Sequence, residues 1–298
     1  MHVTITGASG LIGSALAEHL RREGHTISRL VRSAPATAAD RQWDPAADQL
    51  DPAALAGVDA VVHLAGAGIG DHRWTAAYRR TVLSSRVRST DLLARTLAGM
   101  ADGPKILLSG SAIGFYGNRG DEELDETSAA GTGFLAEVCT QWEAATSPAE
   151  AAGIRVAHLR TGIVLSRKGG ALKKLLPLFK LGLGGRFGNG RQWQSWISID
   201  DEVAAIGHLL GADLAGAVNL TAPNPVTNRD FTRILAEVLH RPGALPVPKF
   251  APALLLGRDL ADHLLFQGQR VLPRALRESG FAFHHATLDA ALENLLKT

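Results

Sequence analysis

The residues whose spacing most directly suggests chemistry are Gly7, Gly10 and Gly13, which recur every three positions after a short apolar run. A turn this tight needs glycine, and the helix after it presents free backbone N–H groups and a positive dipole end to an anion. We therefore predict that the turn binds the diphosphate of a dinucleotide. A tight turn without a ligand is the alternative, because the chain contains 32 glycines. The predicted contacts are Gly7, Ser9, Gly10, Leu11, Ile12 and Gly13.

A cation and a hydroxyl, Arg32 and Ser33, follow the second apolar run at 26–31, where a carboxylate would bind the adenosine ribose of NAD. A 2′-phosphate pairs well with a guanidinium, whereas a carboxylate at that place would repel it. These two residues therefore predict NADP (NADPH) as the cofactor. A solvated arginine at a strand end is the plainer alternative.

Further candidates stand where other apolar runs end. The run at 60–63 leads into Leu64, Ala65 and Gly66, and the small residues Ala65 and Gly66 let the backbone approach a cofactor. Ligands of an open parallel sheet bind outside the carboxyl ends of its strands. We therefore predict that Ser111, after the strand that starts at Lys105, lies where a ligand binds. The remaining predicted cofactor contacts are Leu64, Ala65, Gly66, Ser109 and Thr161.

The elements that must position these residues alternate between strand and helix. Apolar runs near 3–5, 26–31, 60–64, 105–109 and 154–159 alternate with helical patterns at 12–23, 75–97 and 133–151. This order predicts an α/β fold with a doubly wound parallel sheet of Rossmann type. We expect a dinucleotide-binding lobe at 1–165 and a smaller substrate lobe at 166–298. The segment near 196–221 is expected to return to the sheet.

Other polar residues have plainer interpretations. We expect His63 to be a core histidine and Cys139 a small buried residue. The arginines on the helix 75–97 could reach phosphates or an acidic substrate, but a solvated helix face is the preferred interpretation. Asp200 or Asp201 is expected to cap the helix that follows. The acidic run at 121–126 is expected to be a surface loop.

Composition narrows the classes of function. The 298 residues are 46% hydrophobic and 20% charged with a net charge of +2, which disfavours a nucleic-acid surface. No run approaches the roughly 20 apolar residues that span a bilayer, and the start does not resemble a signal peptide. The single cysteine and the scattered histidines predict neither a disulfide nor a metal site. We expect a cytoplasmic protein with a small-molecule substrate.

Seven motifs resemble the extended, atypical branch of the short-chain dehydrogenase/reductase superfamily, in particular epimerase/dehydratase-like oxidoreductases of unknown substrate with a C-terminal tail of unknown function. The resemblance covers nearly the whole chain and implies a bound NADP, a cleft under a C-terminal lobe and often a homodimer. The motifs are GASGLIG at 7–13, WDP at 43–45, HLAG at 63–66, SSRV at 84–87, GFYG at 114–117, WISIDD at 196–201 and QRVLP at 269–273.

One departure from the superfamily concerns catalysis. Active members use a tyrosine and a lysine four residues later, the lysine lowering the pKa of the phenol. Phe134 and Val138 stand at those places, and neither can transfer a proton. Ser111 matches the family's catalytic serine, and Tyr116 is a candidate replacement acid, although the family uses that position to support the loop. Glu137 could be a base, but a surface glutamate is the plainer interpretation.

Two functional hypotheses follow from the resemblance and the departure. The first is an NADP-dependent oxidoreductase or epimerase-like enzyme acting on a small carbonyl or nucleotide-sugar substrate, with Ser111 binding a substrate oxygen and Tyr116 or a water handling the proton. The second is a catalytically reduced NADP-binding sensor or scaffold, motivated by the missing tyrosine and lysine. They differ in whether turnover is retained.

Overall fold

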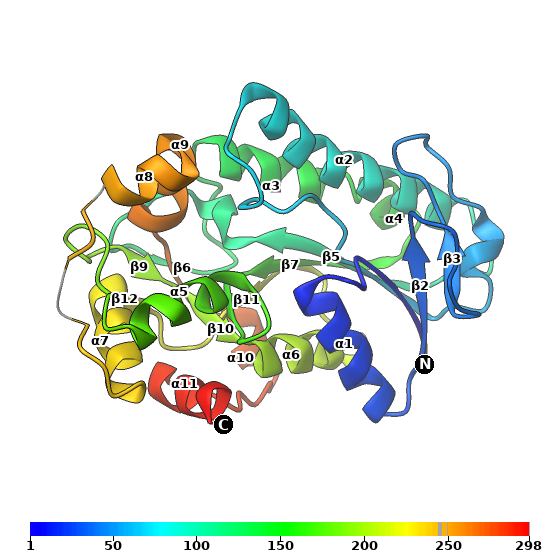
Figure 1. The fold of residues 1–298 in the computed structure, drawn as a ribbon. Helices are drawn as coiled ribbons and strands as arrows, with labels where there is room; N and C mark the ends of the chain where they lie inside the picture. The colour runs from blue at the N-terminus through cyan, green and yellow to red at the C-terminus, as the bar shows by residue number, and fades with distance from the viewer. Residues whose placement is uncertain (244–245, 249, 298) are drawn as a thin grey trace.

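A seven-stranded parallel sheet forms the centre of the protein in this computed structural model, which describes residues 1–243, 246–248 and 250–297 (Figure 1). The strands lie in the order β11-β7-β5-β4-β1-β2-β3, so the chain starts in the middle and winds outward in both directions. This confirms the predicted doubly wound fold. The strands are β1 (His2–Thr6), β2 (Thr26–Val31), β3 (Asp40–Gln42), β4 (Ala60–His63), β5 (Ile106–Ala112), β7 (Arg155–Thr161) and β11 (Gly216–Leu220).

Helices cover both faces of the sheet, which explains why the central strands are apolar along their length instead of alternating. Figure 1 shows α2, α3 and α4 on one face and α1 and α6 on the other. The two faces bury separate clusters, one with Leu16 and Leu20 of α1, the other with Leu93 and Leu97 of α2. The helices are α1 (Leu11–Arg22), α2 (Ala76–Ala98), α3 (Phe134–Ala144), α4 (Ser147–Ala151) and α6 (Ile199–Gly211).

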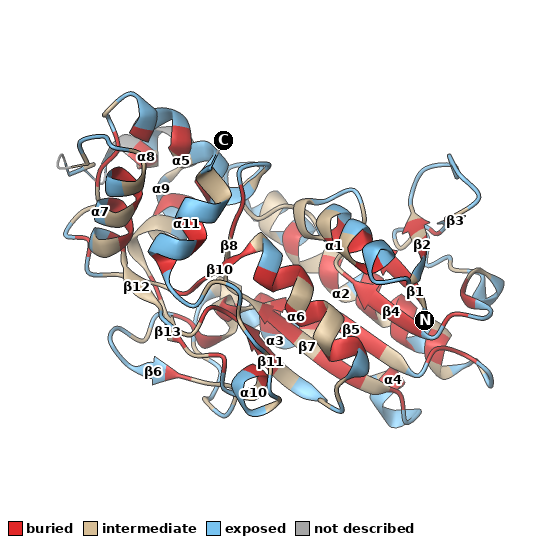
Figure 2. Cartoon of the chain, turned by 90° about the horizontal axis from the view of Figure 1, so that it is seen from below, coloured by how far each residue is buried: buried red, intermediate tan, exposed pale blue. Residues whose placement is uncertain are grey.

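Most of the second half of the chain builds a smaller lobe around its own apolar cluster, which includes Leu172, Trp196, Phe231 and Leu292. Its buried residues lie beside the carboxyl end of the sheet (Figure 2). The segment 196–221 contributes β11 to the sheet, while the division at residue 165 stays a prediction. The lobe and its connections contain β6 (Glu123–Leu124), β8 (Ile163–Leu165), α5 (Gly170–Lys180), β9 (Trp193–Gln194), β10 (Trp196–Ser198), β12 (Val226–Thr227), α7 (Asn228–Val238), α8 (Phe250–Leu256), α9 (Arg258–Ala261), β13 (Arg270–Val271), α10 (Arg274–Glu278) and α11 (Leu288–Leu296).

Two local expectations were wrong. The helix predicted at 133–151 is instead two helices, because α3 ends at Ala144 and α4 begins at Ser147. Pro148 lies in the first turn of α4 and has no N–H to donate to the turn before it, so one continuous helix cannot form. The N-cap of α6 is Ser198, not an aspartate, because the Ser198 Oγ accepts the Asp201 N–H at 3.0 Å. Asp201 is fully buried, and its carboxylate instead accepts the backbone N–H groups of His284 and His285.

The acidic run at 121–126 also differs from the predicted surface loop in part. Leu124 is fully buried in β6, which pairs with β13 near the chain's end. Glu126 is partly buried, and its Oε1 accepts the backbone N–H groups of Asn219 and Ala275 at 3.0 and 3.2 Å. The run therefore fastens the C-terminal segment to the edge of the sheet.

Candidate functional site

The glycine turn after β1 is tight at two of its three glycines. Gly7 has φ +67°, and a Cβ there would lie 2.6 Å from the Leu64 carbonyl oxygen. A Cβ on Gly13 would lie 2.3 Å from the Gly7 carbonyl oxygen. Both close approaches are to backbone atoms, so neither position accepts a side chain without moving the turn. The structure therefore requires glycine at positions 7 and 13, as the sequence predicts for a turn this tight.

The N-terminus of α1, which follows this turn, is open to an anion. Gly10 is the N-cap and supplies no side-chain hydrogen bond, and the first turn of the helix contains no acidic residue. Ser9 and Gly10 are exposed. Among the described residues, the N–H groups of Leu11 and Ile12 have no backbone acceptor. These features fit a dinucleotide diphosphate, which would accept from those N–H groups and neutralise the helix dipole.

The loop after β4 is held next to the glycine turn by Thr6. Its Oγ1 accepts the N–H groups of Leu64 and Ala65 at 3.0 and 3.1 Å and contacts His63 Nδ1 at 2.8 Å. The His63 ring is fully buried, its Nε2 lies 3.2 Å from Ser89 Oγ, and burial lowers its pKa to about 3. The interpretation of His63 as a core histidine is confirmed. Its role is to position the loop that we predict to contact the cofactor.

The predicted 2′-phosphate site lies at the end of β2. Arg32 and Ser33 are both exposed. Within the described part of the chain, neither side chain makes a hydrogen bond, and Arg32 has no ion-pair partner. The guanidinium is therefore available to an outside phosphate, as the sequence predicts for NADP.

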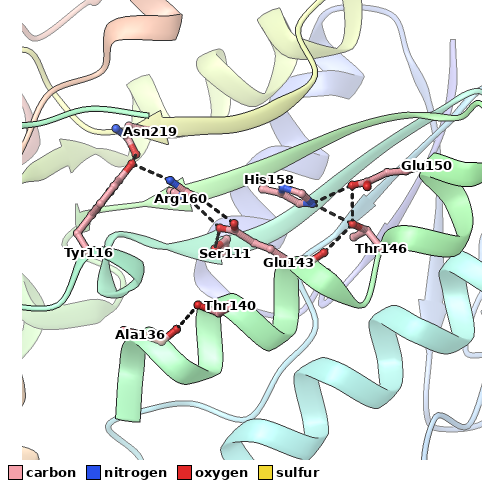
Figure 3. Close-up of polar contacts among 10 residues, drawn as sticks. All are labelled: Ser111, Tyr116, Ala136, Thr140, Glu143, Thr146, Glu150, His158, Arg160 and Asn219. Atoms are coloured by element: carbon pink, nitrogen blue, oxygen red, sulfur yellow. Dashed lines mark hydrogen bonds and ion pairs between the residues drawn. The ribbon is translucent and has the colours of Figure 1, made fainter. Parts of the chain in front are cut away.

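Ser111 is part of a charged network between the sheet and α3 (Figure 3). Its hydroxyl donates to Glu143 Oε1 at 2.6 Å, and the Arg160 guanidinium donates to both oxygens of that carboxylate at 2.8 Å. All three side chains are largely buried. Burial opposes ionisation of Glu143, but the hydrogen bonds from Arg160 and Ser111 hold the pKa of its carboxyl below the usual value. Glu143 is therefore an ionised acceptor that fixes the Ser111 hydroxyl.

Tyr116 closes the other end of this network. Its ring is fully buried, its hydroxyl donates to Asn219 Oδ1 at 2.7 Å, and it accepts from Arg160 Nη1 at 3.0 Å. Burial raises the pKa of the phenol against the opposing effect of the Arg160 charge. A buried hydroxyl with both partners inside the protein supports the Arg160 position, and this geometry disfavours Tyr116 as the proton donor.

The positions of the missing tyrosine and lysine hold no group that can transfer a proton. The Phe134 ring packs edge-on against Trp74, with 5.1 Å between their centroids, and the Arg79 guanidinium lies 5.0 Å from its centre. Val138 is buried. Glu137 is exposed and accepts from the side chain of Gln141, which agrees with its plainer interpretation as a surface residue.

Two predicted cofactor contacts have their side chains turned inward. Ser109 is fully buried, and its Oγ has no hydrogen-bond partner among the described atoms. Thr161 Oγ1 donates to Glu202 at 2.9 Å. Glu202 is fully buried, and burial raises the pKa of its carboxyl to about 8. Any contact of Ser109 with a cofactor would have to come from its backbone.

The arginines of α2 do not form one solvated face. Arg80 and Arg88 are exposed, as expected. Arg79 is half-buried and pairs with Asp259 at 2.9 Å. Arg86 is only 7% exposed. The interpretation of the row as a solvated face is therefore wrong for Arg79 and Arg86, because the lobe covers the first and α3 the second.

Sequence reasoning missed Glu143 and left Arg160 without a role. Glu143 lies on the same face of α3 as the buried residues Ala136 and Cys139. An acidic residue on the apolar face of a helix was therefore the sequence pattern that could have identified it. Arg160 ends an apolar strand, where a buried charge needs a partner.

Across the part of the chain described, no helix could cross a membrane and no cluster of His, Cys, Asp or Glu is arranged to hold a metal.

Comparisons with known proteins agree with this geometry. The profile of the NAD dependent epimerase/dehydratase family matches residues 3–220, and that of a domain of unknown function, DUF1731, matches 247–295. Epimerase family protein Mb2239 of Mycobacterium bovis is 46% identical over 291 residues, covering 97% of this chain and 96% of that protein. YfhF of Bacillus subtilis is 36% identical, covering 99% and 98%.

A solved structure with the same fold contains a cofactor. The crystal structure of human epimerase family protein SDR39U1 (isoform 2) with NADPH superposes with a TM-score of 0.89 and 31% identity, covering 99% of each chain. The resemblance noted from the motifs is confirmed by these matches over almost the whole length.

Proposed function

Since the chain belongs to the NAD-dependent epimerase/dehydratase family, we propose that it is an NADP(H)-dependent oxidoreductase acting on a small carbonyl substrate beside Ser111. The observation that carries the proposal is the glycine turn, with its uncapped and acid-free helix N-terminus directly behind it. The NADPH bound to the human relative supports the choice of cofactor. An epimerase-like reaction would use the same hydride chemistry in both directions.

Some residues of the site would bind the cofactor, and others would orient the substrate. The N–H groups that follow Gly10 would hold the diphosphate, and Arg32 the 2′-phosphate. The cofactor supplies hydride chemistry when bound. Ser111 would donate its hydroxyl to the substrate oxygen, and to do so the proton would turn away from Glu143, which accepts it in this structure while Arg160 holds the carboxylate. Water would supply the proton, because Tyr116 is enclosed by its own partners.

Replacing Arg32 with alanine is expected to weaken NADPH binding by about 2 kcal/mol and leave NADH binding nearly unchanged, because only NADPH carries the phosphate that a guanidinium can pair with. Titration of both cofactors by fluorescence measures the difference. Arg21→Ala, which removes an exposed arginine from the end of α1, is the matched control. Equal losses for both cofactors would contradict the 2′-phosphate assignment.

Replacing Ser111 with alanine is expected to lower turnover on the order of 100-fold while NADPH affinity is unchanged, because the hydroxyl acts on the substrate and not on the cofactor. The measurement is NADPH oxidation against a panel of carbonyl compounds and nucleotide sugars. Thr140→Ala is the matched control, since Thr140 is an exposed residue whose hydroxyl donates to the Ala136 carbonyl of its own helix (Figure 3). Wild-type protein that binds NADPH tightly and oxidises it with no compound on the panel contradicts the proposed activity.

The absence of a proton-transferring side chain at positions 134 and 138 favours a second candidate, an NADP(H)-binding sensor or scaffold. In that case Ser111 and its network would only stabilise the fold. The Ser111→Ala experiment separates the two functions. A loss of turnover with intact NADPH affinity rules out the sensor, whereas tight binding without any turnover in the wild type supports it.

A further inference from the structure

A cavity of about 740 Å³ lies beside α7, in the smaller lobe. The two views show α7 at the opposite end of the molecule from β2 and β3, with α5 and α11 between it and α1 (Figure 1, Figure 2). The cavity is therefore remote from the glycine turn at the start of α1. Its volume falls within the range of roughly 300–1,000 Å³ that is typical of small-molecule sites.

Arginine supplies most of the charge around this cavity. The charged residues that line it are Arg186, Arg229, Arg233, Arg241 and a single acid, Glu237. That acid is already paired, because both oxygens of the Glu237 carboxylate accept from Arg233 Nη1, at 3.0 and 2.8 Å. The other three arginines form no ion pair with any residue that the structure describes. Three positive charges therefore line the cavity without an acidic partner.

Two of these unpaired arginines lie side by side. Gly190 is buried, and a Cβ on it would lie 3.1 Å from Arg229 Cβ and 3.2 Å from Arg186 Cδ. Both side chains therefore pack against the same glycine. Arg229 Nη2 donates to the Asn189 carbonyl oxygen at 3.3 Å, whereas the side chain of Arg186 donates to no atom in the described part of the chain. Most of the donors of this pair are unused.

The C-terminal end of α7 brings two further side chains to the cavity. The N–H groups of His240 and Arg241 donate back to the carbonyl oxygens of Glu237 and Ala236, both at 3.0 Å, which is a Schellman motif. Its left-handed position is usually glycine, but here it is His240, with φ +52°. The Arg241 guanidinium donates to the carbonyl oxygens of Lys180 and His240, at 3.1 and 3.2 Å. A histidine ring thus lines the cavity from a position where glycine would be less strained.

A solvated helix face is the plainer interpretation of these arginines. It explains Arg233, which pairs with an acid four residues later on α7. It does not explain the other three, which come from the loop after α5, the start of α7 and the segment after α7 and meet at one cavity. Like charges repel one another, and a cleft lined by one sign of charge concentrates ions of the opposite sign. The arrangement therefore favours an anionic ligand.

We propose that this cavity binds a small molecule with two or more linked phosphate groups, through Arg186, Arg229 and Arg241, with the His240 ring beside them. Guanidinium groups match phosphate oxygens with paired hydrogen bonds. One phosphate group carries at most about two negative charges near neutral pH, so three unpaired arginines fit a diphosphate or a triphosphate better. Inorganic pyrophosphate and a nucleoside diphosphate share this chemistry. The site is separate from the cofactor turn and goes beyond the proposed oxidoreductase activity.

Calorimetric titration of the NADPH-saturated protein with pyrophosphate tests the proposal, because bound NADPH occupies the glycine turn. We expect one pyrophosphate per chain, bound at least tenfold more tightly than inorganic phosphate. Arg229→Gln and Arg186→Gln are each expected to weaken pyrophosphate binding at least fivefold and to leave NADPH affinity within twofold. Arg277→Gln makes the same charge change at an exposed arginine of α10 and is expected to change neither affinity.

His240→Gly gives a second test in a variant whose backbone suits the fold. Glycine accepts the left-handed conformation more easily, so the melting temperature is expected to be at or above that of the wild type. Pyrophosphate binding is expected to be several-fold weaker, because the ring is removed from the cavity. Unchanged pyrophosphate affinity in this variant would contradict the role given to His240.

Titration with ADP separates the two sources of the phosphate chemistry. ADP that binds more tightly than pyrophosphate supports a nucleotide ligand, and pyrophosphate that binds at least as tightly as ADP supports recognition of the phosphates alone. Three results would overturn the proposal. They are a wild type that binds pyrophosphate no more tightly than phosphate, an Arg229→Gln protein with wild-type affinity, and an Arg277→Gln protein that loses as much affinity as Arg229→Gln, which would show a general effect of charge.

Discussion

Gly13→Ala is expected to abolish NADPH binding, lowering the affinity at least 100-fold. The new methyl group would lie 2.3 Å from the Gly7 carbonyl oxygen and 2.9 Å from Ala8 Cα. Both are backbone atoms, so the turn has to open and the N–H groups of α1 lose their common direction. Fluorescence titration with NADPH measures the loss, and a thermal melt separates it from unfolding.

Gly211→Ala is the control for this prediction. Gly211 ends α6, and a Cβ there would meet no atom within 4 Å. We expect normal NADPH affinity in this variant. A Gly13→Ala protein that is folded and binds NADPH within threefold of the wild type would show that the turn is not where the diphosphate binds.

Glu143→Ala is expected to lower the free energy of unfolding by about 3–5 kcal/mol, because it leaves the Arg160 guanidinium buried without its bidentate partner. Ser111 loses its acceptor at the same time, so turnover is expected to fall as well. Urea unfolding at pH 7 measures the change in stability. The protein is large enough to unfold in more than one step, so two spectroscopic probes should be compared.

The pH dependence of this variant has a defined sign. Because the folded-state pKa of the Glu143 carboxyl lies below its usual value, its contribution is complete above the unfolded pKa and is lost as the pH falls through the folded pKa. The difference in stability between wild type and Glu143→Ala should therefore shrink in acid.

Two further variants test whether the unpaired Arg160 charge causes the loss of stability in Glu143→Ala. Glu137→Ala removes an exposed acid from the same helix and should change stability by less than about 0.5 kcal/mol. Glu143→Ala combined with Arg160→Met removes both charges and should be more stable than Glu143→Ala alone. A loss below about 1 kcal/mol in the single variant would show that Arg160 finds another partner or water.

The local sequence pattern was sufficient to predict those structural features that depend only on residues close together in the chain. The spacing of Gly7, Gly10 and Gly13 determines a turn and a helix start within seven residues, and the apolar runs determine strands buried on both faces. His63 was interpreted correctly for the same reason, since it lies inside such a run. The wrong predictions were at helix ends, at Ser198 and Pro148. The apolar periodicity of a helix does not locate its ends to within one or two residues.

The sequence by itself therefore determined the class of fold and the tight glycine turn. It also predicted NADP from Arg32 and, through the family resemblance, the loss of the usual tyrosine and lysine. Only the tertiary structure decided which charges are paired. Glu143 and Arg160 are 17 residues apart, and Tyr116 and Asn219 are 103 apart, yet they form one network. The position of Arg86 was decided in the same way. The free energy of a charge depends on its burial and its partners, and both are set only when α2 and α3 pack on the sheet.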